Sequence, residues 1–199
     1  MGTKFSTRVW VSVVGIASIF FGSKGYADTV ISVADFGLKP DTRENAVAYV
    51  QKAIEACRGK EPVTLVFPEG RYDFWPQYAH EKNYYETNTY DVFPKRLAML
   101  FEGLHNITVD GNGSQFVMHD RIQPITVENC DGVTLKNFSI DWDIPLTAQA
   151  RVTKVGSDFF EIEINVLESP YIIEDGKLVF VGEGWKSALG SMIAVSYTH

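Results

Sequence analysis

The chain has 199 residues, of which 45% are hydrophobic, so it can form one domain with a buried core and part of a second. Its formal net charge of -7 argues against a nucleic-acid or anionic-membrane partner, because such partners require a basic surface. With only two cysteines the chain is not a disulfide scaffold, and a neutral or cationic ligand fits its charge better.

The first 27 residues are predicted to be a secretory signal peptide. Lys4 and Arg8 form a positive start, Val9–Gly22 is an apolar run short for a membrane span, and Gly25-Tyr26-Ala27 offers small residues for cleavage. An uncleaved anchor helix is the alternative. We expect cleavage after Ala27, export, and no membrane partner afterwards.

The cysteines and histidines give little support for a metal or cofactor. Cys57 lies on the apolar face of a predicted helix and Cys130 at a strand edge, so packed thiols are expected, with a bridge between them left open. A polar contact pair of His119 with Asp120 is conceivable, although a lone His beside Asp is more often structural. No spacing typical of metal ligands is found among the four histidines, which are His80, His105, His119 and His199.

Strand and helix patterns alternate after the signal peptide. Val30–Val33 predicts a strand, and Asp41 with Glu44 predicts a capped helix that runs to about Cys57. The helix should bury one face, formed by Val47, Val50, Ile54 and Cys57. A buried strand, a turn and a further strand are then predicted at Val63–Phe67, Pro68–Gly70 and Arg71–Phe74.

An aromatic-rich stretch, Asp73–Lys95, shows neither a helical nor a strand period and is predicted to be a long ordered loop. Such aromatic side chains can stack on the faces of a bound ligand, which makes Trp75 and Tyr85 candidates for substrate binding. A loop that packs on itself and closes the side of the domain is the alternative.

After a strand at Leu97–Phe101, two similar blocks follow in tandem within Leu104–Asp143. His105–Gly111 and Asp131–Asn137 share a pattern of polar, apolar and turn residues, and Ile107 lies twenty-six positions before Val133. Such a repeat of short strands is typical of a solenoid in which each coil buries its apolar residues against the next. Asp110–Gly113 is predicted to be a turn.

The pattern changes near Ile144. Alternating apolar and polar residues at Thr147–Val155, Phe159–Val166 and Lys177–Val181, with turns between them, predict antiparallel hairpins of a small β-barrel or sandwich. We therefore divide the chain into a signal peptide (1–27), a cap with the first solenoid coils (28–143), the start of a barrel insertion (144–193) and a non-native tail (194–199). Both folded units are expected to be incomplete.

The residues quoted above resemble a known family. Asp35-Phe36-Gly37, the helix ending at Cys57 and Phe67-Pro68 look like the start of right-handed parallel β-helix carbohydrate enzymes, where the helix caps the open end of the solenoid. With the loop Trp75–Tyr90 and the block Asn137–Asp143 before a hairpin insertion, the chain is similar, over Asp28–Ile193, to the N-terminal part of bacterial α-1,3-galactosidases of glycoside hydrolase family 110.

This resemblance implies an all-β fold, a right-handed parallel β-helix with a capping helix and an antiparallel barrel insertion. It also implies release of terminal α-1,3-linked galactose from glycans of the blood group B type, by inversion and without metal, in the periplasm or at the surface of a Gram-negative bacterium. The partner would be a glycan with terminal α-galactose, whereas the oligomeric state is undefined.

Two carboxylates, Asp141 and Asp143, flank Trp142 at the end of the second block. In an extended strand they share one face about 6.5 to 7 Å apart, but inversion requires the acid and the base on opposite sides of the sugar. Asp141 and Asp143 are therefore candidates for substrate binding, or for backbone hydrogen bonds, rather than acid and base. Trp142 should pack between coil and barrel.

The catalytic carboxylates are expected beyond residue 193, so the chain alone should be inactive. A β-helix polysaccharide lyase and a non-catalytic carbohydrate-binding solenoid remain the alternatives.

Overall fold

The computed structural model describes residues 29–84 and 94–189. These residues form strands and a single α-helix, which confirms the predicted all-β class, and within them no helix is long and apolar enough to cross a membrane. The elements of the first part are β1 (Thr29–Ser32), η1 (Val33–Phe36, a 3-10 helix), α1 (Val47–Cys57), β2 (Val63–Val66), β3 (Arg71–Phe74), β4 (His80–Lys82), β5 (Lys95–Glu102), β6 (His105–Met118), β7 (Gln123–Glu128) and β8 (Asp131–Trp142).

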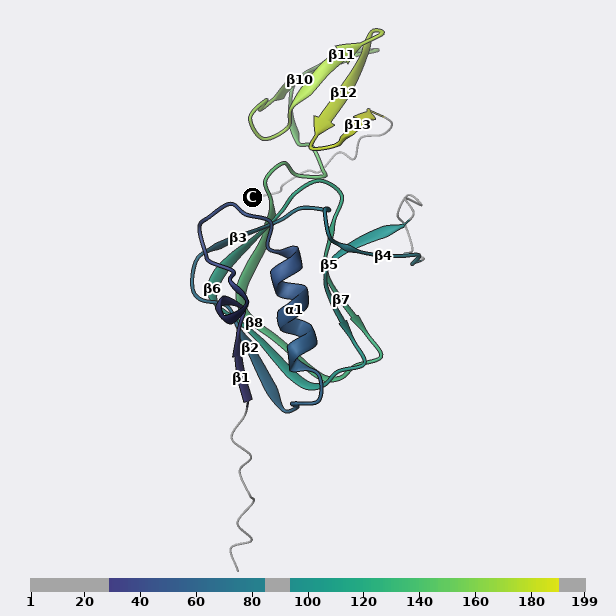
Figure 1. Ribbon diagram of the computed structural model, residues 1–199. Helices are drawn as coiled ribbons and strands as arrows, with labels where there is room; N and C mark the ends of the chain where they lie inside the picture. The colour runs from purple at the N-terminus through teal and green to yellow at the C-terminus, as the bar shows by residue number, and fades with distance from the viewer. Residues whose placement is uncertain (1–28, 85–93, 190–199) are drawn as a thin grey trace, which may run out of the picture.

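Two sheets flank α1 (Figure 1). In the first sheet β1 pairs with β2, β2 and β3 pair with the two halves of β6, and β8 pairs with β6, all in parallel. In the second sheet β7 pairs in parallel with β5, and the short strand β4 lies antiparallel on the other side of β5. Successive strands β5, β6, β7 and β8 therefore alternate between the two sheets.

One shift recurs where β5 pairs with β7 and where the first half of β6 pairs with β8, whereas the second half of β6 pairs with β8 at a shift of twenty-four residues, as in Met118 with Trp142. Ile107 of β6 lies opposite Val133 of β8, and Met99 of β5 lies opposite Ile125 of β7, a shift of twenty-six residues in each case. The predicted pairing of the two blocks is confirmed. This pairing places apolar residues of successive strands above one another, so each strand is buried by the next.

The turn predicted at Asp110–Gly113 is wrong, because β6 continues through it. The pairing with β8 shifts between Asp110 and Ser114, and Asn112 and Gly113 have positive φ values of 50° and 84°. These two residue types tolerate the left-handed region, so the strand bends there and resumes its ladder. Strand β7 was not predicted.

The helix begins later than predicted. Asp41 has a φ of 61° and accepts a hydrogen bond from the Arg71 backbone N–H at 2.9 Å, whereas the Asn45 side chain accepts the Val47 N–H at 3.1 Å. The cap predicted at Asp41 is therefore wrong, since that carboxylate ties the segment before the helix to β3. The end at Cys57 and the buried face, made of Val47, Val50, Ile54 and Cys57, are confirmed.

The core lies between α1 and the two sheets. Phe116 is its centre, with ring centroids 4.7 Å from Phe67, 5.6 Å from Phe74 and 4.8 Å from Phe138. Cys57 is fully buried, Cys130 is half-buried, and both are free thiols. The packed thiols that the sequence predicted are thus confirmed.

The aromatic-rich stretch is not entirely loop. His80–Lys82 forms β4, in register with Lys95–Leu97 of β5, because an antiparallel edge was open there. Tyr85 lies outside the described residues, as do the predicted signal peptide and the predicted tail.

Antiparallel strands follow residue 149, as predicted. They are β9 (Ala150–Val155), β10 (Phe160–Ile164), β11 (Tyr171–Glu174), β12 (Lys177–Gly182) and β13 (Trp185–Ala188). β9 pairs with β10, and β12 lies between β11 and β13. The turn at Asp175-Gly176 has positive φ at both residues, which matches the twist of a two-residue hairpin. We call residues 150–188 the antiparallel segment; β10–β13 lie at the top of Figure 1.

Candidate functional site

Three parallel strands of the first sheet end side by side, and a polar or aromatic side chain follows each of them. The final residues of β3, β6 and β8 are paired in register. Backbone hydrogen bonds from His119 to Phe74 (2.9 Å) and from Asp143 to Met118 (3.0 Å) continue this ladder. Trp75, His119 and Asp143 therefore follow neighbouring strands at one edge, which we call the sheet edge.

Asp73, on β3, is the buried acceptor of the site. Its fully buried carboxylate accepts hydrogen bonds from Arg71 Nη2 at 2.6 Å and from His119 Nε2 at 2.9 Å. Burial by itself raises the pKa of the Asp73 carboxyl, but the hydrogen bonds from Arg71 and His119 outweigh it and hold this pKa below its usual value. Asp73 is therefore an anion at neutral pH.

Arg71 connects Asp73 to Asp143. Its Nη2 atom donates to Asp143 Oδ1 at 2.9 Å, and hydrogen bonds to Asp73 and then to Asp143 raise the pKa of the guanidinium despite burial. Arg43 Nη1 lies 3.7 Å from the same Asp143 oxygen and 3.9 Å from Asp73 Oδ1. Two guanidinium groups thus fix the Asp143 carboxylate at the sheet edge.

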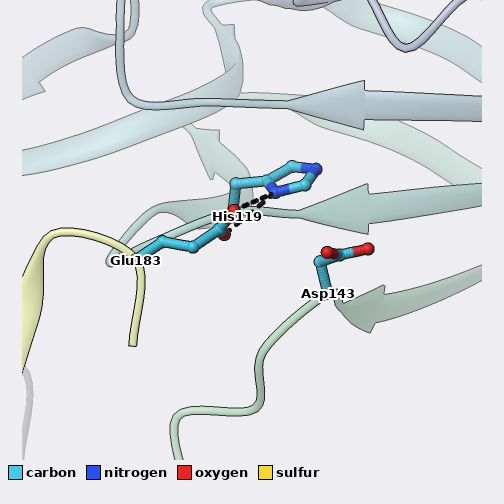
Figure 2. A group of neighbouring side chains, drawn as sticks. All are labelled: His119, Asp143 and Glu183. Atoms are coloured by element: carbon cyan, nitrogen blue, oxygen red, sulfur yellow. Dashed lines mark hydrogen bonds and ion pairs between the residues drawn. The ribbon is translucent and has the colours of Figure 1, made fainter. Parts of the chain in front are cut away.

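His119 lies between Asp73 and the antiparallel segment. Its ring is stacked on the Trp75 indole, with centroids 3.8 Å apart and 10° between the planes. Its Nδ1 atom lies 2.9 Å from both carboxylate oxygens of Glu183, in the turn between β12 and β13 (Figure 2). Each ring nitrogen of His119 thus lies at hydrogen-bond distance from a carboxylate, so this side chain connects Asp73 with Glu183.

His119, Asp143 and Glu183 also form a group that could hold a metal ion, since one ligand atom from each lies within 4.8 Å of the others. Such a ligand set would suit a divalent cation. However, Arg71 and Arg43 already lie against Asp143, and their positive charges oppose a second cation at that carboxylate. The donors and acceptors at this edge are better suited to the hydroxyl groups of a neutral ligand.

Asp143 and Glu183 face each other from different elements, as an acid and base pair would. Their carboxylate oxygens lie within 4.8 Å, whereas an inverting glycosidase separates its two carboxyl groups by roughly 6.5 to 9.5 Å to admit water. Both groups are also engaged by other side chains, Asp143 by Arg71 and Glu183 by His119. The pair is therefore not arranged for inversion.

The structure brings two of the predicted candidates together and separates a third. Trp75 and Asp143 both lie at the sheet edge, where His119 occupies one face of the indole. Asp141 instead accepts the Trp142 backbone N–H at 2.8 Å, and Trp142 packs against the core. Tyr85, the fourth candidate, lies outside the described residues.

Sequence reasoning missed Arg43, Arg71, Asp73 and Glu183, and it favoured a structural His119 over a polar contact pair with Asp120. Arg71 and Asp73 stand two apart in a strand, a spacing that places both side chains on one face and could have suggested their pairing. Glu183 carried no comparable signal, because it joins His119 across 64 positions. Asp120 contributes its backbone N–H to Glu183 rather than its side chain to His119.

A second polar cluster lies on the second sheet. Glu102 and Glu128 are register neighbours, and Lys82 Nζ bridges them at 2.7 and 2.9 Å. The Tyr84 hydroxyl also donates to Glu128. The hydrogen bonds from Tyr84 and then from Lys82 lower the pKa of Glu128. This cluster attaches the residues around β4 to the sheet.

Part of the chain matches a described family of domains. A family model named GLAA-B beta-barrel domain I matches residues 148–198, which include the antiparallel segment.

Whole-chain comparisons match proteins with one kind of name. The chain is 60% identical over 167 residues to "Alpha-1,3-galactosidase B" of Bacteroides thetaiotaomicron, which is 84% of this chain and 27% of the relative. It is 37% identical to "Alpha-1,3-galactosidase A" of Shewanella woodyi over 79% of this chain and 26% of the relative. With "Alpha-1,3-galactosidase A" of Bacteroides fragilis the identity is 35%, over 80% of this chain and 27% of the relative.

These matches define the class first: the chain is similar to bacterial proteins named as galactosidases, and its residues 148–198 match a GLAA-B barrel domain. The particular relatives are α-1,3-galactosidases A and B, and the predicted resemblance to them is confirmed over most of the chain. The chain spans about a quarter of the length of the curated relatives it matches.

Proposed function

We propose that the whole protein to which this chain belongs is an exo-acting glycoside hydrolase that removes terminal α-1,3-linked galactose from glycans of the blood group B type. The observation that carries this proposal is the 60% identity, over 84% of the chain, to a protein named α-1,3-galactosidase B. Because the chain spans 27% of that relative, the activity is proposed for the whole protein and not for residues 1–199 alone.

In this proposal the sheet edge borders the glycan, with Trp75 and Asp143 in contact with it. Asp143 is 39% exposed and its position is fixed by Arg71, so it can accept hydrogen bonds from sugar hydroxyls without reorganising. The half-buried Trp75 offers an aromatic surface of the kind on which sugar rings stack. Asp141 and Tyr85 remain candidates for further contacts.

The proposed architecture is a right-handed parallel β-helix capped by α1, with an antiparallel barrel inserted after about residue 143. The parallel pairing of β5 with β7 and of the first half of β6 with β8, both at a shift of twenty-six residues, supports the helix, and the match of residues 148–198 to a barrel domain supports the insertion. Apolar side chains of β7 and β8, among them Val127 and Leu135, are 46% and 40% exposed, as expected for strands on which further coils would stack.

The proposed mechanism inverts the anomeric configuration and uses an acid and a base beyond residue 193. The close spacing of Asp143 and Glu183 supports this choice, because no sugar and water would fit between them. Residues 28–193 by themselves are therefore expected to release no galactose.

The test uses the whole protein with a branched, fucosylated α-1,3-galactosyl oligosaccharide and with its linear counterpart. We expect release of galactose, and proton NMR of the first product should show the β-anomer if the mechanism inverts. Binding of both oligosaccharides without any release would contradict the hydrolase and favour a non-catalytic binding protein. If the α-anomer is released first, only the inverting mechanism is contradicted, and the hydrolase activity stands.

We also propose export through the signal peptide formed by residues 1–27. The positive start and apolar run of this segment support the proposal. N-terminal sequencing of the mature protein from its native host should give Asp28 as the first residue, and a retained Met1 would contradict cleavage.

A further inference from the structure

A bridge of hydrogen bonds joins three distant parts of the chain at His119. Asp73 lies on β3, His119 follows β6, and Glu183 lies in the turn between β12 and β13. The His119 side chain is 3% exposed, and both of its ring nitrogens are used, at 2.9 Å each. The antiparallel segment is thus connected to the buried polar residues of the first sheet.

The bridge lies within a cluster of charged side chains. Asp73, Asp143 and Glu183 contribute three negative charges, while Arg71 and Arg43 contribute two positive charges within 4.0 Å of them. His119 lies between the Asp73 and Glu183 carboxylates, and the Asp73 carboxylate is fully buried. A buried charged group of this kind is stable only while its partners remain in place.

Further contacts hold the same turn against the residues that follow His119. The Asp120 backbone N–H donates to Glu183 at 3.2 Å, and the Arg121 guanidinium lies over the Trp185 ring at 5.7 Å. Gly184 has a φ of 72°, and a Cβ atom there would lie 2.5 Å from the Asp120 carboxylate. The turn therefore fits closely on residues 119–121, and Gly184 permits this approach.

The rest of the antiparallel segment is far less buried. All six residues of β9 and all four of β11 are exposed, so the segment has little apolar contact to fix its position. The polar contacts of Glu183 are then the main restraint on where its sheet lies, since a small apolar interface gives little resistance to movement.

We propose that the Asp73–His119–Glu183 bridge fixes the antiparallel segment over the sheet edge, with His119 as a positioning residue of the proposed glycan site. His119 positions this site through two contacts: it holds Glu183, and it supports the Trp75 indole on which the sugar would stack. The role of the bridge in holding the segment stands on the observed contacts, whereas its role in glycan binding rests on the proposed function.

The first test measures the position of the segment without any glycan. Spin labels at Leu135→Cys in β8 and Ile173→Cys in β11, with Cys130→Ser, report the distance between the two units in the 199-residue chain. Glu183→Ala should broaden the distance distribution by about twofold or more, as expected when a restrained unit becomes mobile. The matched control is Glu174→Ala, which removes an exposed ion pair to Lys186 in the same sheet and should leave the distribution unchanged.

Glu183→Gln separates the loss of the bridge from general damage to the turn. The amide oxygen can still accept from His119, so this variant should restore most of the parent distribution. An unchanged distribution in Glu183→Ala would overturn the bridge as a restraint, as would equal broadening in Glu183→Ala and Glu174→Ala.

The second test uses the whole enzyme and a galactosyl oligosaccharide. Glu183→Ala should raise KM about tenfold with a much smaller change in kcat, and Glu183→Gln should recover most of this loss. An unchanged KM together with a broadened distance distribution would overturn the role of the bridge in positioning the glycan site. Its role in holding the segment would stand. If the parent enzyme releases no galactose, the proposed function fails, while the distance measurement still decides on the bridge.

Discussion

The imidazole of His119 lies flat on the indole of Trp75, with 3.8 Å between ring centroids, and it thereby uses one face of an aromatic residue that the sequence suggested for sugar stacking. The stack makes Trp75 part of the buried polar site rather than a free aromatic residue in a loop. Its removal should affect both stability and ligand binding.

Trp75→Ala should therefore destabilise the chain by about 1 to 3 kcal/mol, because the stacked partner of a buried ring is lost. The comparison is Tyr78→Ala, which removes a 74% exposed aromatic side chain from the same loop and should cost less than about 0.5 kcal/mol. Chemical denaturation measures both values. Equal effects of the two variants would show that the stack contributes nothing.

Asp73 should make stability sensitive to acid. Since its folded-state pKa lies below the unfolded value of about 3.9, its stabilisation is present above that pH and is lost as pH falls further. We expect the free energy of unfolding to fall below about pH 4, and Asp73→Asn to reduce that dependence.

At neutral pH, Asp73→Asn should cost about 3 kcal/mol, because Arg71 and His119 lose a buried anionic partner. The exposed turn residue Asp175 provides the control, as Asp175→Asn should change neither the free energy of unfolding at neutral pH nor its dependence on pH. Denaturation of the three proteins at several pH values is the measurement, and parallel pH profiles for parent and Asp73→Asn would contradict the assignment.

Lys82→Met should lower the melting temperature by a few degrees, because Glu102 and Glu128 then repel each other across paired strands. The loss should shrink in 1 M salt, where the screening length falls to about 3 Å. Lys186→Met, which breaks a single exposed pair with Glu174, should have a smaller effect. A salt-independent loss would point to packing instead of charge.

Cys57 should be unreactive in the folded chain. Its thiol is fully buried, and burial raises its pKa to about 11, so almost no thiolate is present at pH 8. Mass spectrometry after brief treatment with a thiol reagent should find Cys57 unmodified in the native chain and modified in denaturant. Equal labelling in both states would show that the helix opens readily.

The sequence predicted those parts of the fold that follow from local periodicity. The buried face of α1, strands β2 and β3, and the register of Ile107 on Val133 were all visible as patterns of apolar residues. The start of α1 was not, because the residue before the helix, Ala46, has no capping side chain that a pattern could reveal. Asn45 accepts the Val47 backbone N–H from the position before Ala46, while Asp41 binds the backbone of Arg71 thirty residues later.

The candidate site was only partly predictable for a related reason. Trp75 and Asp143 could be recognised by type and position, but their proximity depends on strands that end together at one edge. The contact of Glu183 with His119 depends on how the antiparallel segment is placed, which no local pattern encodes.

The separation of these partners along the chain has a consequence for synthesis on the ribosome. Asp73 and His119 emerge long before Glu183, so the parallel sheets can assemble while His119 Nδ1 still faces water. Only after the turn between β12 and β13 has been translated can Glu183 complete the bridge. Glu183 is the last residue of the site to be synthesised. It would therefore complete the burial of a charge that Asp73, one of the first, introduces.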